Sequence, residues 1–457
     1  MKTNLSSQIS LHRVSPRYYR PENAFEKSVL TRLEKIPTDI YESVEEGANY
    51  IACEIAQTIR EKQKAGRFCV LALPGGDSPS HVYTELIRMH KEEGLSFRNV
   101  IVFNMYEYYP LSPDAINSNF NALKSMLLDH IDIDKQNIFT PDGSIAKDTI
   151  FEYCRLYEQR IESFGGIDIA LLGIGRVGNI AFNEPGSRLN STTRLILLDN
   201  ASRNEASKIF GTLDNTPISS ITMGVATILG AKKVYLLAWG ENKAAMIKEC
   251  VEGPITDTIP ASYLQTHNNA HVALDLSAAM NLTRIQRPWL VTSCEWNDKL
   301  IRSAIVWLCQ LTDKPILKLT NKDYSEHGLG ELLALYGSAY NVNIKIFNDI
   351  QHTITGWPGG KPNADDSNRP ERANPYPKKV IVFSPHPDDD VISMGGTLRR
   401  LCDQHHDVHV AYETSGNIAV GDEEVIRYCE YLRDVCEKYS PDSVSYTHLR
   451  AHETRSN

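Results

Sequence analysis

The amino-acid sequence predicts an α/β fold: a mostly parallel sheet with helices on both faces, followed by a second, incomplete α/β domain. Short runs of continuous apolar residues alternate with helical segments, and strands that are apolar on both faces are typical of a parallel sheet covered by helices. The runs that predict strands in the first domain are 68–73, 100–103, 167–172, 195–198, 234–238 and 271–274. In such sheets the functional sites gather at the carboxyl ends of the strands.

The first predicted helix, over 42–64, follows a polar leader at 1–39. Its apolar residues recur at helical spacing and form one stripe: Val44, Ala48, Ile51, Ala52, Ile55 and Ile59. The strand at 68–73 comes next, then the loop 74–79, and then a second helix to about residue 91. This order of strand, loop and helix repeats along the chain and favours parallel pairing.

The chain divides into six predicted segments. They are a leader (1–39), a first domain (40–285), an α/β extension of unknown role (286–355), a linker (356–378), a truncated second domain (379–444) and a non-native tail (445–457). The extension has strand-like runs at 289–292 and 344–347, and the linker is rich in glycine and proline. The tail has no apolar period and an unrelated composition.

Composition and charge exclude several classes of protein. The 457 residues are 42% apolar and 23% charged, which excludes disorder and collagen. Lys and Arg number 48 against 57 Asp and Glu, so the net charge is −9 and no broad basic field exists for a nucleic acid. No signal-peptide core, membrane-spanning run or CxxC pair is present. We expect a cytoplasmic protein that binds a small anion, without a nucleic-acid or membrane partner.

Two glycine-rich loops follow predicted strands. The loop 74–79 contains Gly75, Gly76 and Ser78, and its free N–H groups at a helix start suit a phosphate, although a simple turn explains the same residues equally well. The loop 173–185 superficially resembles a dinucleotide-binding fingerprint. Pro185 at its end makes a long helix there unfavourable, so no nicotinamide cofactor is implied.

Several motifs, taken in order over about residues 40–285, resemble the glucosamine-6-phosphate deaminase family. They are the loop 74–79, Asn104–Tyr108, Asn183–Pro185, 222–227, 239–243 with 251–254, and 260–267. The resemblance implies a Rossmann-like domain that converts glucosamine 6-phosphate to a ketose phosphate and ammonia without a cofactor, and it admits a homo-oligomer. It also implies that the Gly75–Ser78 loop, Lys208 and Lys243 hold the phosphate. Either lysine alone could equally be a solvated surface residue.

Three positions depart from that family's acid–base set. Tyr106 stands where the family has an aspartate base, and Val177 and Asn179 stand where it has the aspartate and histidine of ring opening. Of this set Glu184 alone is retained. Valine carries no proton, asparagine does not titrate, and tyrosine is a poor base at neutral pH. We therefore expect deaminase turnover to be absent or very slow.

A second motif, from Val380 to Thr397, places a histidine and three aspartates between a strand and a helix. It resembles the signature of the zinc-dependent N-acetylglucosaminyl de-N-acetylases. The resemblance implies that His386 and Asp389 are zinc ligands and that Asp388 is the base, with Asp390 in place of the family's glutamate. That family takes a third ligand from a distant downstream histidine, which this chain lacks, so we expect an incomplete zinc site that binds weakly.

These observations indicate a protein of amino-sugar-phosphate metabolism, and two classes of function remain open. The first domain is either an isomerising enzyme that uses a different base set, such as Glu107 and Glu184, or a non-catalytic module. Such a module would bind a phosphorylated amino sugar or regulate the attached de-N-acetylase. The changes at Tyr106, Val177 and Asn179 favour the module.

Overall fold

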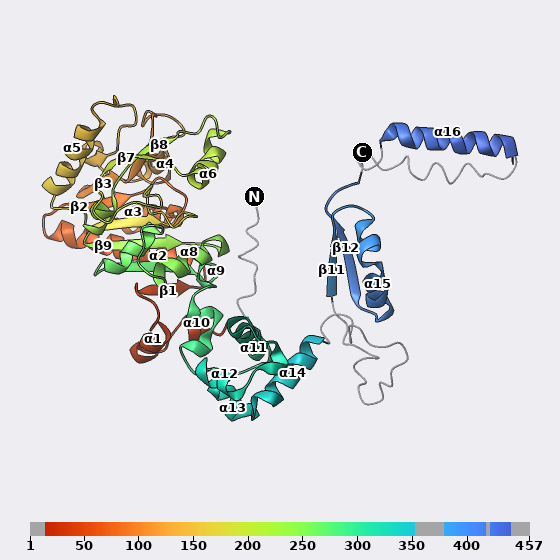
Figure 1. Cartoon of the computed structure of the whole chain (residues 1–457). Coiled ribbons are helices and arrows are strands. Elements are labelled where there is room, and N and C mark those ends of the chain that lie inside the picture. Colours follow the sequence, from red (N-terminus) through yellow and green to blue (C-terminus); the bar gives the residue numbers. More distant parts are fainter. Residues whose placement is uncertain (1–13, 352–378, 417–420, 440–457) are drawn as a thin grey trace. The chain divides into compact units, whose positions relative to one another are not determined.

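The computed structural model describes residues 14–351, 379–416 and 421–439 (Figure 1). The chain separates into two compact units, one built mainly from the residues up to Asn297 and the other from most of the chain after it. None of the helices in the described ranges is long and apolar enough to cross a membrane.

A seven-stranded, entirely parallel sheet forms the centre of the first unit. In spatial order its strands are β1 (Thr38–Tyr41), β10 (Ala270–Asp275), β9 (Lys233–Ala238), β6 (Ile169–Gly173), β2 (Cys69–Leu73), β3 (Val100–Asn104) and β5 (Ile138–Phe139). Every residue of β2 and of β3 is buried, because both faces of the sheet are covered. This confirms the predicted fold class.

Helices cover both faces of the sheet, and consecutive strand residues alternate between two buried clusters. In β2, Val70 and Ala72 belong to one cluster, whereas Leu71 and Leu73 belong to the other. The helices of the first unit are α1 (Ala24–Leu30), α2 (Val44–Lys64), α3 (Ser80–Glu93), α4 (Asn119–Met126), α5 (Ile150–Ser163), α6 (Asn200–Phe210), α7 (Val225–Leu229), α8 (Ala244–Val251), α9 (Leu276–Ala279) and α10 (Thr283–Gln286). Helices α2, α3 and α4 bury their apolar residues on one face, and α5, α7, α8, α9 and α10 on the other.

Helix α2 illustrates how the sequence sets these boundaries. The Ser43 hydroxyl accepts a hydrogen bond from the Glu46 backbone N–H at 3.1 Å and caps the helix start. The residues that α2 buries include Ile51, Ile55 and Ile59, which lie one helical turn apart. The apolar stripe predicted from the sequence is therefore the face that packs on the sheet.

The run at 195–198 forms a strand, but not in the central sheet. Strand β7 (Arg194–Leu197) pairs antiparallel with β8 (Ser219–Thr222), which pairs antiparallel with β4 (Tyr106–Tyr109). Leu197 is 73% exposed, so this run is apolar without being buried on both faces. Apolar composition predicts that a strand exists, and the pairing partner decides which sheet it joins.

Residues expected to form a polar leader pack into the first unit where the structure describes them. Strand β1 pairs with β10 from Thr38 onward, and helix α1 precedes it. Tyr18, Leu30 and Ile36 are buried in the core cluster of one sheet face. The apolar residues of this stretch are isolated along the sequence, so periodicity did not reveal that they are buried.

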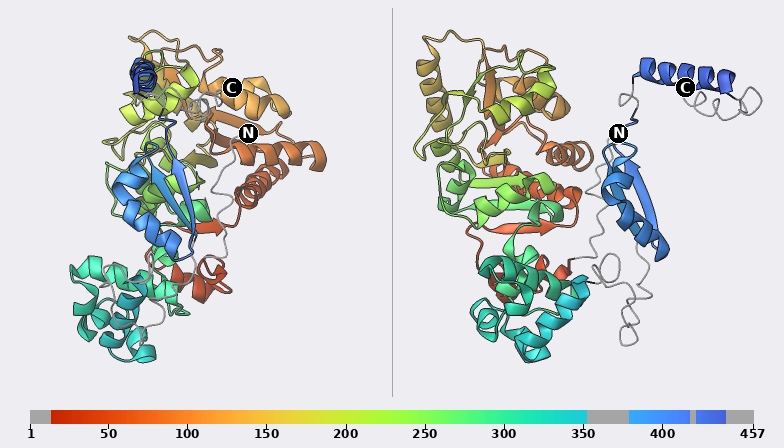
Figure 2. Two further views of the ribbon diagram at one scale, coloured as in Figure 1. Left: turned by 90° about the vertical axis from the view of Figure 1, so that its right-hand side faces the viewer. Right: turned by 45° about the vertical axis from the view of Figure 1, so that its right-hand side comes forward.

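The expected α/β extension is helical in its described part (Figure 2). Its helices are α11 (Asp298–Thr312), α12 (Asn321–Glu326), α13 (Gly330–Tyr336) and α14 (Ala339–Gln351). The strand-like run at 344–347 lies inside α14, where the buried Val342 and Ile346 are one turn apart. Short apolar runs fit either element, and the α/β prediction was wrong here for that reason.

The described C-terminal elements begin with the predicted strand. Strands β11 (Lys379–Ser384) and β12 (Asp407–Tyr412) pair in parallel, with α15 (Asp389–Asp403) between them in sequence. A further helix, α16, spans Asp422–Tyr439. The linker 356–378 and the tail 445–457 lie outside the described residues.

Candidate functional site

A cavity of about 730 Å³ opens at the carboxyl ends of β2, β6 and β9. The chain reaches this edge from β2 and from β6, which lie side by side although about 100 residues separate them in sequence. Seven of the residues singled out from the sequence line the cavity: Gly75, Gly76, Ser78, Tyr106, Asn179, Lys208 and Lys243. Such an edge, where strand order changes direction, is where α/β sheets bind ligands.

The loop after β2 owes its path to a glycine. A Cβ atom on Gly75 would lie 2.1 Å from the Asn119 carbonyl oxygen, so only glycine lets the loop approach the start of α4 this closely. The Trp239 indole N–H donates to the Ser78 carbonyl oxygen at 2.9 Å and fixes the other end of the loop. The loop is thus held from both sides, and α3 begins directly after it at Ser80.

The loop after β6 contacts the first loop at its base. A Cβ on Gly173 would lie 2.7 Å from the Ser78 hydroxyl oxygen. Further along, the Gly175 N–H donates to the Asn179 carbonyl at 2.9 Å, and the Asn179 side-chain amide donates to the Ala181 carbonyl at 3.1 Å. Asn179 therefore braces this loop as well as lining the cavity, whereas Val177 is not among the lining residues. The chain forms no helix here, consistent with Pro185.

Two lysines reach the cavity from different elements. Lys243 follows β9, is partly buried, and donates to the Ile174 carbonyl at 2.8 Å. Burial lowers the pKa of Lys243; Glu205 acts in the opposite direction and Arg176 in the same one. Lys208 comes from α6 and is exposed at the rim. The cavity thus has one cation that is partly desolvated and one that water reaches freely.

Tyr106 forms part of the aromatic wall of the cavity. Its ring centroid lies 4.5 Å from that of Phe182, and a Cβ on Gly76 would lie 3.2 Å from its hydroxyl oxygen. Burial raises the pKa of Tyr106, and the Tyr108 hydroxyl and the Glu107 carboxylate raise it further. The hydroxyl is therefore protonated at neutral pH, where it can donate a hydrogen bond and is a poor base.

The alternative base Glu107 does not line the cavity. Its carboxylate accepts three backbone hydrogen bonds, each 2.9 Å long, from Tyr108, Asn119 and Phe120. Burial raises the pKa of Glu107 to about 7 against the effect of these bonds. Glu107 holds the start of α4 in place through these bonds, which argues against its use as a base.

Glu184 is buried beside the start of α6 and is likewise not a lining residue. The Asp199 backbone N–H donates to its carboxylate at 3.4 Å. Burial raises the pKa of Glu184, while a hydrogen bond from the Ser202 hydroxyl lowers it. Ser202 lines the cavity, so its side chain lies between the Glu184 carboxylate and the cavity.

Two carboxylates that line the cavity, Asp77 and Glu205, were not among the residues predicted from the sequence. Asp77 lies within the loop 74–79, between two of the predicted phosphate-binding residues. Glu205 lies three residues before Lys208 on α6, and this spacing places two side chains on the same face of a helix. That spacing is the signal that could have identified Glu205.

The second motif forms one tight turn between β11 and α15. Asp389 Oδ2 accepts hydrogen bonds from the His386 backbone N–H at 3.1 Å and lies 3.0 Å from His386 Nδ1. Asp388 is exposed beside them, whereas Asp390 is buried and lies 3.2 Å from the Ser384 hydroxyl that donates to it. Within the described ranges, no three His, Cys, Asp or Glu side chains are grouped as a metal site would require.

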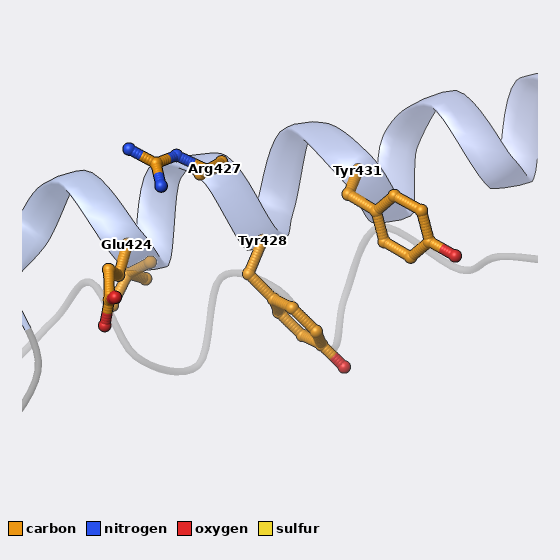
Figure 3. Close-up of a pocket in the computed structure, with 5 residues that line it drawn as sticks. Glu424, Arg427, Tyr428 and Tyr431 are labelled. Atoms are coloured by element: carbon orange, nitrogen blue, oxygen red, sulfur yellow. The ribbon is translucent and has the colours of Figure 1, made fainter.

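A further surface hollow runs along α16 (Figure 3). It is lined by residues of that one helix, among them Glu424, Tyr428 and Tyr431, and the two tyrosines project from the same side. None of the residues predicted from the sequence lies there. The cavity at the edge of the parallel sheet is therefore the candidate functional site.

Two family models match this chain. Residues 42–273 match the glucosamine-6-phosphate isomerases and 6-phosphogluconolactonases, and residues 381–455 match the GlcNAc-PI de-N-acetylases. Both resemblances expected from the sequence are confirmed. The second match reaches residue 455, within the stretch expected to be a non-native tail.

Similar proteins agree with these matches. A glucosamine-6-phosphate deaminase-like protein of Bacteroides thetaiotaomicron is 92% identical over 432 residues, which are 94% of this chain and 65% of that protein. The chain therefore spans less than two thirds of that relative. Glucosamine-6-phosphate deaminase of Bacillus velezensis is 40% identical over 52% of this chain and 95% of that protein.

Among solved structures, a monomeric glucosamine-6-phosphate deaminase superposes with a TM-score of 0.52 at 37% identity, over 54% of this chain and all of that one. The parallel sheet, the cavity at its carboxyl edge and the matches over 42–273 and 381–455 lead to one assignment. The chain belongs to the glucosamine-6-phosphate isomerase and 6-phosphogluconolactonase family, and a GlcNAc-PI de-N-acetylase domain follows that family's domain.

Proposed function

We propose that the first domain binds a small phosphorylated amino sugar in the cavity at the carboxyl edge of its sheet. One observation carries the proposal: Lys208, Lys243 and the loop 74–79 line the same cavity although they lie far apart in sequence. The deaminases to which the chain is similar act on glucosamine 6-phosphate by name, which supports the choice of ligand.

In this proposal the phosphate lies between the Ser78 hydroxyl and the two lysines. Lys243 contributes more per contact, because a partly desolvated cation attracts an anion more strongly than an exposed one. Its hydrogen bond to the Ile174 carbonyl fixes the direction of the ammonium group before the ligand arrives. Tyr106 offers a hydroxyl donor and an aromatic face to the sugar.

We infer that deaminase turnover in this domain is absent or very slow. Tyr106 is protonated, Asn179 does not titrate, and neither Glu107 nor Glu184 lines the cavity. A positioned acid or base contributes roughly 10²–10⁴-fold to the rate. These features favour a binding or regulatory module over an enzyme with a substituted base set.

Ammonia release and ligand binding separate the two classes. Purified protein is incubated with glucosamine 6-phosphate, ammonia is followed by a coupled assay, and the dissociation constant is measured by calorimetry. Binding without ammonia release supports the module. Release at a rate of about 1 s⁻¹ or more supports the enzyme, and no binding at all contradicts the proposed function.

Lys208→Ala is expected to weaken the binding of glucosamine 6-phosphate by about 10-fold, because a hydrogen bond between charged groups is lost. The affinity for unphosphorylated glucosamine should stay the same. Calorimetric titrations with both sugars measure this difference. Lys147→Ala removes an exposed lysine outside the cavity and serves as the control. An equal loss for both sugars would contradict a phosphate contact at Lys208.

For the second domain we propose an incomplete metal site of the GlcNAc-PI de-N-acetylase type, with His386 and Asp389 as metal ligands and Asp388 as the residue in the position of the base. Imidazole and carboxylate are suitable zinc donors, and the two are held on one turn. Zinc would supply a Lewis acid at this turn. The described ranges provide two such donors, one fewer than a catalytic zinc site requires.

Zinc bound by this chain is therefore expected to be stripped readily by a chelator, since two protein ligands leave the coordination sphere open to water. The measurement is the metal content after washing with a chelator, compared with His386→Ala. Retention of about one zinc per chain that His386→Ala abolishes would reveal a third ligand outside the described ranges.

A further inference from the structure

The cavity at the edge of the parallel sheet is lined by ionisable groups of both signs. Its charged side chains are the cations Lys208 and Lys243 and the carboxylates Asp77 and Glu205. A site for phosphate alone gains nothing from carboxylates, because like charges repel. Asp77 lies inside the very loop proposed to hold the phosphate, so its presence there needs a physical explanation.

The Asp77 side chain is exposed to the cavity and makes no hydrogen bond or ion pair within the described part of the chain. Its backbone contributes to the local fold, because the Asp77 carbonyl accepts a hydrogen bond from the Ser80 N–H at 3.1 Å where α3 begins. Its carboxylate is therefore not needed for the local fold, and it is available to a ligand.

Asp77 lies near Tyr106, the side chain proposed above to contact the sugar. Its neighbour Gly76 faces the Tyr106 hydroxyl, which a Cβ at Gly76 would approach to 3.2 Å. The charges of Asp77 and Glu205 both raise the pKa of Tyr106, and the charge of Glu205 also raises that of Lys243. Both carboxylates are thus close enough to act on groups that line the cavity.

We propose that Asp77, assisted by Glu205, is the specificity-determining residue that recognises the ammonium group of an amino-sugar phosphate. The cavity then offers a zwitterion both signs of charge, the lysines for its phosphate and the Asp77 carboxylate for its amine. This inference rests on the proposed function, because it concerns the same cavity and the same class of ligand.

The test compares three sugar phosphates that differ in one group. Glucosamine 6-phosphate carries an ammonium where glucose 6-phosphate carries a hydroxyl, and N-acetylglucosamine 6-phosphate carries a neutral amide. Dissociation constants for all three are measured by calorimetry near neutral pH with the unmodified full chain and with Asp77→Asn. The control is Asp129→Asn, an exposed aspartate outside the cavity.

The unmodified chain is expected to prefer glucosamine 6-phosphate over both analogues by about 10-fold, the contribution of one charged hydrogen bond. Asp77→Asn should abolish most of that preference. It should leave the affinity for glucose 6-phosphate unchanged or increase it, because removal of a carboxylate also removes repulsion from the phosphate. Glu205→Gln should reduce the preference less, and the control should keep it.

An unchanged ratio of affinities in Asp77→Asn, or an equal loss for all three ligands, overturns the role of Asp77 while leaving phosphosugar binding intact. Failure of the unmodified chain to bind any of the three overturns the proposed function and this inference with it. Thermal melting verifies that each variant is folded, and Asp77→Gly provides a second substitution at the same exposed position.

Discussion

The triple variant Tyr106→Asp, Val177→Asp and Asn179→His is expected to release ammonia from glucosamine 6-phosphate at least about 10²-fold faster than the unmodified chain. These changes restore the residue types that the deaminase family resemblance implies at the three positions. The base for proton transfer and the pair for ring opening act in sequence, so one restored step leaves the others as barriers. Each single variant should therefore stay close to the unmodified rate.

Two of the three restored side chains would stand in the cavity itself. Tyr106 and Asn179 line the cavity, and Val177 lies two residues from Asn179 on the same loop. Ammonia is measured by a coupled assay with saturating sugar phosphate. Arg98→Ala, an exposed change outside the cavity, controls for handling of the protein.

Two outcomes would contradict the expectation. An unmodified chain that turns over at an ordinary enzymatic rate of about 1–10³ s⁻¹ would mean that other residues supply the acid and base. A triple variant that binds the sugar phosphate normally and still releases no ammonia would mean that the loop after β6 does not hold its new side chains in a productive position.

Arg284→Met is expected to lower the free energy of unfolding of the first unit by about 3–5 kcal/mol, because it leaves a buried carboxylate without its counter-ion. Arg284 Nε lies 2.8 Å from Glu34 Oε1, and both side chains are 2% exposed. A second guanidinium nitrogen donates to the Thr38 carbonyl at 2.9 Å. The pair thus connects α10 to the segment that leads into β1.

The size of the stability loss in Arg284→Met should depend on pH, because Glu34 titrates near neutral pH. Burial raises the pKa of Glu34 from 4.5 to about 7, against the effect of Arg284. Folding therefore takes up a proton between these values, and the contribution of Glu34 to stability falls as the pH rises through this window, then levels off. Without Arg284 the ionised Glu34 carboxylate destabilises the folded state further. The decrease in the free energy of unfolding caused by Arg284→Met should therefore be larger at about pH 8 than at about pH 5.

Urea denaturation followed by tryptophan fluorescence measures the effect. Arg17→Met, which breaks the exposed pair with Glu26, is the matched control and should cost less than about 1 kcal/mol. The double variant Glu34→Leu and Arg284→Met removes both charges and should recover most of the stability. Equal stability of the single variant and the control would show that the buried pair contributes nothing.

Much of the fold could be predicted from local pattern. Strands β2, β3, β6, β9 and β10 are continuous apolar runs in the sequence and are buried in the central sheet. Helix α2 follows its apolar stripe. Strands β1 and β8 gave no such signal: Thr38 and Ser220 are polar yet buried. Their place in the sheets depends on partners, β10 and β4, that are distant in sequence.

The candidate site likewise has residues that the sequence predicted and others whose role only the structure shows. Gly75, Ser78, Lys208 and Lys243 were predicted from the family resemblance and line the cavity. Gly75, Ser78 and Lys243 follow the carboxyl ends of β2 and β9, whereas Lys208 comes from helix α6. Glu107 belongs to a motif as well, but its carboxylate is occupied by the N–H groups of α4. A motif records which residue types are present, whereas burial and hydrogen bonding decide which of them a ligand can reach.

The sequence alone determined the two families, the parallel sheet and the two glycine-rich loops, because apolar periodicity and short motifs are local properties of the chain. Tertiary structure decided that Asp77 and Glu205 share a cavity with Lys208 and Lys243, and that Arg284 pairs with Glu34. These contacts join residues that are far apart in the chain. Their electrostatic energies depend on distance and burial, which only the folded chain defines.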